Sequence, residues 1–142
     1  MKKPEILVSV PSDIGAQRLG TSLALDALYV ADAERKQPVL KNIPSKILSS
    51  FPNKRGEAGP YAQGKYAKIL SELNNNTAKE ICEVVKKSYP LVISGDHSNA
   101  IGIMAGIREA IGADKKLGVI WVDAHADLHT PYTTPSGNIH GM

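Results

Sequence analysis

The sequence is poor in the features that mark disulfide-stabilised and membrane-spanning proteins. It holds one cysteine, Cys82, so no internal disulfide can form, and the apolar helical pattern around it predicts a buried small side chain. No apolar stretch approaches the roughly 20 residues that span a bilayer. Lys2 and Lys3 precede only a short apolar run over 6–10, which indicates a strand and not a signal peptide. We therefore expect a cytoplasmic protein with no membrane partner.

An excess of charge of one sign is also missing. The net charge is +3, too small to indicate a nucleic-acid partner, although eight Lys or Arg and one acid, Glu57, lie between Arg35 and Lys68. That segment is either a solvated surface or an anion-binding face. It contains no recognised nucleic-acid motif, which favours the first interpretation. The loop 15–21 has the glycine spacing of a phosphate-binding loop, but Thr21 replaces the required lysine.

What is present is the composition of one soluble globular domain. With 142 residues, 42% of them apolar and 22% charged, the chain can bury a core. Short apolar runs alternate with helical periodicity, the pattern of an α/β fold with a parallel sheet. We expect strands at 5–10, 39–43, 91–93 and 117–122, and helices at 23–30, 66–73, 77–88 and 101–111. Asn74–Asn76 should end the helix at 66–73, and Thr77 should cap the helix that follows.

Three side chains that can bind metal follow the last predicted strand at alternate positions. Asp123, His125 and Asp127 come directly after the run 117–122, which is continuously apolar like a buried parallel strand. Side chains two apart on an extended backbone point to the same side. Ligands in open α/β sheets bind outside the carboxyl ends of the strands, where this triplet lies. The pattern predicts a metal site.

A second group of polar residues supports that prediction. The sequence Ser94-Gly-Asp-His-Ser98 follows the strand at 91–93, and parallel strands end at the same edge of a sheet. His97 can therefore meet the triplet, whereas alone it would more often be an ordinary loop histidine. Ser98 is explained as a helix N-cap and not as a nucleophile. Burying several acids and histidines beside apolar strands is costly without a cation.

The donor set limits the metal and its chemistry. Two Asp and two His without a Cys ligand favour Mn, Fe(II) or Co over a structural zinc. A carboxylate can bridge two ions, and two ions about 3.5–4 Å apart lower the pKa of a shared water toward roughly 7. Such a site supplies hydroxide for hydrolysis at neutral pH.

These motifs resemble the arginase, or ureohydrolase, family. The resemblance rests on the segments 95–98, 123–127 and 130–142, the last of which differs among members of the superfamily. It implies a three-layer αβα fold with a parallel sheet and two Mn²⁺ ions. His97 and Asp127 would ligate one ion and His125 the other, while Asp123 would bridge both.

The resemblance also implies roles beyond the metal ligands. His140 would shuttle a proton to the leaving amine, with Asp127 as the second residue of the catalytic set. The amino-acid end of the substrate would contact Thr134, Ser136, Asn138 and His129, although the family usually has Asn at the position of His129. The implied reaction converts L-arginine and water to L-ornithine and urea through a metal-bridging hydroxide. Another guanidino or amidino substrate is the alternative.

The family pattern predicts more sequence than this chain contains. Members carry a further metal motif with two Asp, and a Glu that holds the guanidinium, and neither has a counterpart before Met142. We therefore expect 1–142 to be the N-terminal part of a single arginase-like domain, truncated before the C-terminal strands. The isolated chain would then be inactive, and a metal-binding remnant or interaction module is the rival interpretation. A homo-oligomer, trimer or hexamer, follows from the resemblance alone.

Overall fold

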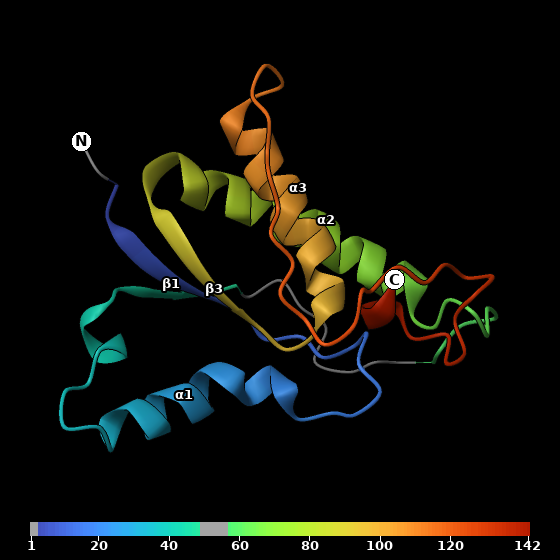
Figure 1. Ribbon diagram of the computed structural model, residues 1–142, viewed down its shortest axis with the longest axis horizontal. Helices are drawn as coiled ribbons and strands as arrows, with labels where there is room; N and C mark the ends of the chain where they lie inside the picture. The colour runs from blue at the N-terminus through green and yellow to red at the C-terminus, as the bar shows by residue number, and fades with distance from the viewer. Residues whose placement is uncertain (1–2, 49–56) are drawn as a thin grey trace.

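The computed structural model describes residues 3–48 and 57–142. The elements follow one another in α/β order, and Figure 1 shows α1 on one side of the sheet with α2 and α3 on the other. This is the predicted αβα arrangement. The bounds are β1 Glu5–Val10, α1 Ala24–Ala33, β2 Ser45–Ile47, α2 Ala67–Lys87, β3 Tyr89–Ser94 and α3 Ala100–Ile111.

The sheet has three parallel strands in the order β2-β1-β3. β1 pairs with β3 along its whole length, from Glu5 opposite Tyr89 to Val10 opposite Ser94. Because this register is unbroken, both strands end at the same edge of the sheet. The loops that follow β1 and β3 therefore begin side by side, which positions the candidate site.

The core lies on both faces of β1, as expected of a strand covered by helices on each side. Val8 and Val10 pack with Leu48 and with Ile81 and Val84 of α2 in one cluster. Leu7, whose side chain points to the other face of the sheet, is also buried. Cys82 is buried in α2 without a disulfide, as predicted.

Helix α2 runs through the three asparagines, so the predicted break at Asn74–Asn76 is wrong. Asn74 is buried, and its amide donates to the carbonyl oxygen of Leu70 at 3.0 Å while its side-chain oxygen accepts from the Gly102 amide at 2.7 Å. The low helix propensity of asparagine is offset by this contact with α3. Thr77 consequently lies buried within the helix and does not cap one.

The strand expected at 39–43 is also wrong, because Leu40–Asn42 forms a 3-10 turn and β2 begins at Ser45. The buried carboxylate of Asp32 accepts hydrogen bonds from the backbone amides of Val39 and Leu40 at 2.8–3.0 Å. These bonds bend the chain before the strand. The basic segment 35–68 includes Lys54 and Arg55, which lie outside the described residues.

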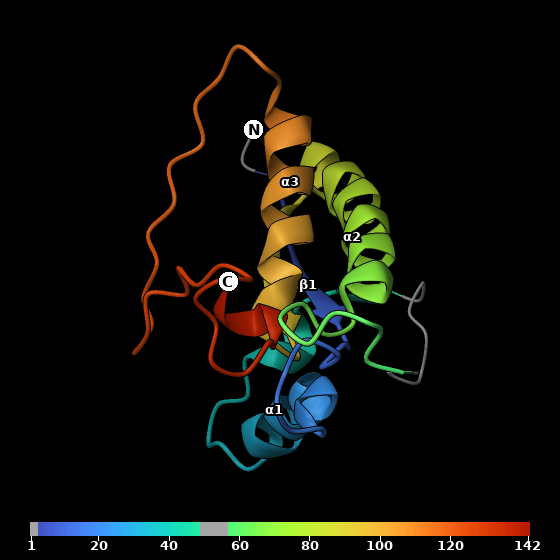
Figure 2. The same ribbon diagram turned by 90° about the vertical axis from the view of Figure 1, so that its right-hand side faces the viewer.

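The run 117–122 is not a buried strand, contrary to the prediction. The segment is unpaired, and its apolar side chains are exposed, up to 92% for Ile120 and 91% for Val122. Figure 2 shows it as an orange trace that leaves the end of α3 and runs apart from the helices. A strand needs a hydrogen-bonding neighbour, and the described residues place none beside this run.

None of the described helices is long and apolar enough to cross a membrane.

Candidate metal centre

His97 is carried by a short 3-10 helix, His97–Asn99, that begins immediately after β3. Asp96 caps this turn, and the N-cap position of α3 is Asn99, so the prediction that Ser98 caps the helix is wrong. The Asp96 carboxylate accepts from the Ser98 amide at 2.8 Å, whereas the Ser98 hydroxyl is buried and has no hydrogen-bond partner among the described residues. The turn buries Ser98 and Asn99 and leaves the His97 ring half exposed, at 51%.

The triplet after 117–122 is held by local hydrogen bonds, not by a strand. Asp123 accepts from the backbone amide of His125 at 2.7 Å, which turns the chain back on itself. Asp127 lies in the left-handed region, at φ 49°, where a non-glycine residue is uncommon. The turn brings the carboxylates of Asp123 and Asp127 to the same side.

Residues about thirty positions apart meet here, as the sequence predicted. The Nδ1 atom of His97 lies 3.0 Å from Asp123 Oδ2 and 2.9 Å from Asp127 Oδ2. One ligand atom from each of these three residues falls within 4.8 Å of the others. His125 stands at the rim, with Nδ1 3.3 Å from Asp123 Oδ1 and its side chain 83% exposed.

The electrostatics of the cluster favour the ionised form of Asp123. The backbone amide of His125 lowers the pKa of Asp123, burial opposes this, and the His97 and His125 rings lower it further. The side chains of Asp123 and Asp127 are only 16% and 12% exposed. Two partly buried carboxylates that share an imidazole provide negative charge and nitrogen and oxygen donors, the chemistry that suits a divalent cation.

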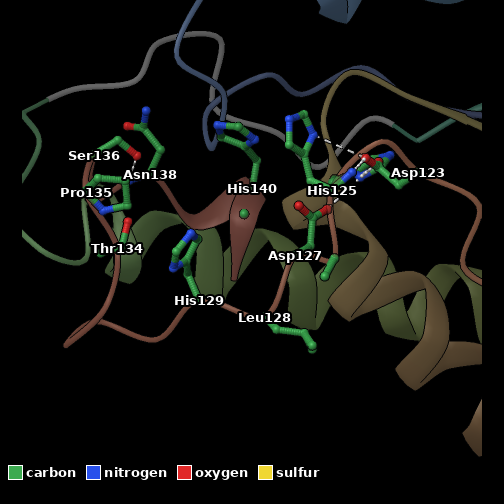
Figure 3. A pocket seen from close by; sticks show the side chains of 13 residues that line it. Asp123, His125, Asp127, Leu128, His129, Thr134, Pro135, Ser136, Asn138 and His140 are labelled. Carbon is green, nitrogen blue, oxygen red and sulfur yellow. Dashed lines mark hydrogen bonds and ion pairs between the residues drawn. The ribbon is translucent and has the colours of Figure 1, made fainter.

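The cluster opens into a cavity of about 420 Å³. Figure 3 shows the triplet at one end of this cavity and Thr134, Ser136 and Asn138 at the other, with His140 between them. Every residue predicted for the site lines it, namely His97, Asp123, His125, Asp127, His129, Thr134, Ser136, Asn138 and His140. The structure therefore brings the whole predicted set together, although it does not test their roles.

The far wall of the cavity is fixed to the segment before α2. Gly137 has φ 73°, and a Cβ there would lie 1.9 Å from the carbonyl oxygen of Ala62, so only glycine fits. Its own carbonyl oxygen accepts from the Lys65 amide at 2.9 Å. The hydroxyls of Thr134 and Ser136 accept from the backbone within the loop, at 3.0 and 3.2 Å. Each hydroxyl keeps its own proton available as a donor.

The two histidines of this wall are placed differently. The His129 ring lies 3.3 Å from the Thr133 hydroxyl, and its backbone amide donates to the Gly141 carbonyl oxygen at 3.1 Å. His140 lies on the 3-10 helix Ile139–Gly141 and is half buried. Like His125, it is outside the group of three that could share one ion among the described residues, so its role stays a prediction.

Sequence reasoning missed one aromatic contact. Trp121 meets the His97 ring edge to face, with ring centroids 5.3 Å apart. Trp121 lies in the run 117–122, where the sequence predicts a buried strand, and the pattern gives no signal for a contact with His97. This contact packs the imidazole against the segment that carries the triplet.

Comparison with known proteins identifies the family. The sequence matches the model of the Arginase family over residues 4–142. The chain belongs to the arginase family. The arginase of Bacillus caldovelox is 38% identical over 99% of this chain and 47% of its own length, and that of Emericella nidulans is 43% identical over 68% and 29%.

Solved arginases share the fold. The structure of Entamoeba histolytica arginase in complex with L-ornithine aligns with 100% of this chain and 49% of its own, at a TM-score of 0.81 and 25% identity. Native B. caldovelox arginase gives a TM-score of 0.78 at 35% identity. This arginase-family chain thus spans about half the length of the relatives it matches. Arginases are metal-dependent, and the group of His97, Asp123 and Asp127 fits that requirement.

Proposed function

We propose that this chain supplies one half of an arginase site, which hydrolyses L-arginine to L-ornithine and urea. The observation that carries the proposal is the convergence of His97, Asp123 and Asp127 within 4.8 Å, at the end of a cavity lined by the loop 130–142. An imidazole and two carboxylates bind a divalent cation, and the remaining volume accommodates a small molecule. The similarity of the whole chain to an arginase that binds L-ornithine supports the assignment of the substrate.

The proposed ions are two Mn²⁺. His97 and Asp127 would hold one ion, His125 the other, and Asp123 would contact both, since its two oxygens face His97 and His125 separately. Bound divalent ions supply acidified water at neutral pH. The protein's own contribution is to hold these donors on two segments that are packed against each other through His97 and Trp121.

The remaining residues of the cavity would bind the substrate and protonate the leaving amine. We assign the amino-acid end of arginine to Thr134, Ser136, Asn138 and His129, whose polar groups line the wall opposite the cluster. Neutral hydrogen-bonding side chains suit a zwitterionic head group. His140, between the two ends of the cavity, would carry a proton to the leaving amine, a task for which imidazole is suited near neutral pH. A cytoplasmic homo-oligomer, trimer or hexamer, is the state we propose for the intact enzyme.

The decisive experiment has two arms because the chain spans half of its relatives. In the first, the 142-residue chain is titrated with Mn²⁺, and Asp123→Asn is titrated as the variant. We expect weak binding by the parent, which carries only part of the family's metal ligands, and loss of binding in the variant, because Asp123 touches both proposed ion positions. Unchanged metal content in Asp123→Asn would remove the metal assignment.

The second arm measures urea. Residues 1–142 replace the matching half of B. caldovelox arginase, and urea released from L-arginine is measured with the isolated chain as the control. We expect urea from the chimera and none from the isolated chain. A folded chimera that binds Mn²⁺ but releases no urea would favour the rival interpretation, a metal-binding remnant without catalysis, or a different amidino substrate.

A further inference from the structure

Behind His97 lies a buried polar cluster that the proposed reaction does not use. It joins the loop after β1 to the turn after β3, and its centre is Asn99, which is completely buried at 0% exposure. The Asn99 amide nitrogen lies 2.9 Å from the carbonyl oxygen of Ser12, 2.8 Å from the Ser94 hydroxyl and 3.1 Å from the carbonyl oxygen of Asp96. One side chain thus contacts both loops.

The chemistry of these acceptors fixes the orientation of the amide. Two of them, from Ser12 and Asp96, are carbonyl oxygens that cannot donate, so only the NH₂ end of Asn99 can face them. The Ser94 hydroxyl donates to the Asp96 carbonyl oxygen at 3.0 Å and accepts from Asn99. Leucine in place of Asn99 would remove the donor to the buried Ser12 carbonyl oxygen, which is costly, and would leave the Asp96 carbonyl oxygen with the Ser94 hydroxyl alone as a side-chain donor.

The loop after β1 and the turn after β3 also pack closely against each other, so the backbone has little room to shift and replace a lost hydrogen bond. The Asp96 carboxylate accepts from the Gly15 amide at 3.0 Å as well as from Ser98. A Cβ on Gly95 would lie 2.3 Å from the Ser12 carbonyl oxygen, and one on Gly15 would lie 2.4 Å from the Ser98 hydroxyl. His97 lies within this pinned turn, and its ring is directed out toward Asp123 and Asp127.

We infer that Asn99 is a positioning residue that fixes the turn bearing His97 against the loop after β1 and so holds the imidazole in place for the metal. The inference rests on the proposed metal binding, but the placement of His97 can be measured without metal. Asn99 does not touch the cavity, and it acts through the backbone of the residue two positions before it.

The test compares Asn99→Leu with Asn74→Leu in the 142-residue chain. Asn74 is a matched control, since it is also buried and also bonds two backbone groups, but it joins α2 to α3 at Gly102 and not to the His97 turn. We expect Asn99→Leu to weaken Mn²⁺ binding by about 10- to 100-fold, the range for residues that orient metal-binding histidines. Asn74→Leu should lower stability to urea but leave the affinity unchanged.

The metal-free measurement is the nuclear Overhauser effect between the His97 ring and the indole of Trp121, the one tryptophan in the sequence. We expect Asn99→Leu to weaken it and Asn74→Leu to retain it. If the parent binds no Mn²⁺ but Asn99→Leu still loses this signal, the positioning role is supported and the metal function is rejected. A folded Asn99→Leu with the parent's ring contact and affinity would overturn the inference.

A second variant covers the case in which Asn99→Leu does not fold. Ser94→Ala removes one of the three acceptors of Asn99 and leaves the asparagine itself in place. We expect a smaller change in the same direction, in both the ring contact and the affinity for Mn²⁺. If folded Ser94→Ala matches the parent in both measurements, the positioning role is rejected.

Discussion

At the scale of single residues, the site depends on side chains whose spacing along the sequence is informative. Asp123, His125 and Asp127 were found from alternation, and His97 from its place after a strand. The prediction that they meet is confirmed by the 2.9–3.0 Å contacts of His97 with Asp123 and Asp127. The extended backbone expected over 123–127 is not observed. A turn at His125 and the left-handed backbone of Asp127 bring the side chains together instead.

The role of His140 is testable at this scale. In the chimera with B. caldovelox arginase, we expect His140→Ala to keep its Mn²⁺ content, because the role we propose for this ring is proton transfer and not ligation. Urea release should fall by roughly 10²–10⁴-fold, the usual contribution of a positioned acid or base. Metal content and rate are measured on the same samples. Loss of metal, or nearly normal turnover, would show that His140 does not transfer the proton.

At the scale of elements, contacts between helices override local propensity. Asparagine triplets disfavour a helix, yet α2 continues through Asn74–Asn76 because Asn74 bonds to Gly102 of α3. The close approach is possible because Gly102 lacks a side chain, and a Cβ there would lie 2.6 Å from the Asn74 carbonyl oxygen. The helix is thus stabilised by a partner 28 positions away and not by its own sequence.

Two neighbouring substitutions in α2 separate these effects. Asn75 is exposed, so Asn75→Ala should stabilise the chain by about 0.5 kcal/mol through helix propensity alone. Asn74→Ala makes the same change in propensity but leaves the buried Gly102 amide unpaired, so we expect a net loss of about 1–3 kcal/mol. Urea unfolding of both variants measures the difference. Equal effects on stability would contradict the structural role of Asn74.

At the scale of the whole molecule, the sheet and the segment 117–122 leave apolar surface uncovered. β3 pairs with β1 on one side and with no described strand on the other, and Val119, Ile120, Trp121 and Val122 are 42–92% exposed. The chain spans about half the length of related arginases, and Ile120, Trp121 and Val122 line a cavity together with residues of β3. Free strand edges and exposed apolar patches promote association.

We therefore expect the 142-residue chain to self-associate through this surface. The double variant Ile120→Lys/Val122→Lys should lower the average mass in sedimentation velocity, because it places two like charges in the patch. Val30→Lys is the control, since Val30 is 66% exposed on α1, away from the segment 117–122. A parent chain that sediments as a monomer, or equal effects of the two variants, would contradict this prediction.

The sequence by itself determined the family of this chain, the candidate donors and most of its elements. Apolar runs predicted β1 and β3, helical periodicity predicted α3 up to Gly112, and residue types at fixed spacings predicted the four candidate donors. The resemblance to arginases implied the other polar residues that line the cavity. These features depend on neighbours a few positions apart, whose geometry the local backbone specifies.

Tertiary structure decided what depends on groups far apart in the chain. That Asp96 reaches Gly15, 81 positions away, that Asn99 reaches Ser12, and that α2 crosses its asparagines follow from loops and helices packed side by side. The run 117–122 shows the converse, because its apolar sequence favours a strand but no described neighbour supplies the hydrogen bonds. A strand forms only when a partner pairs its backbone groups, and the pairing partner is not encoded within the strand itself.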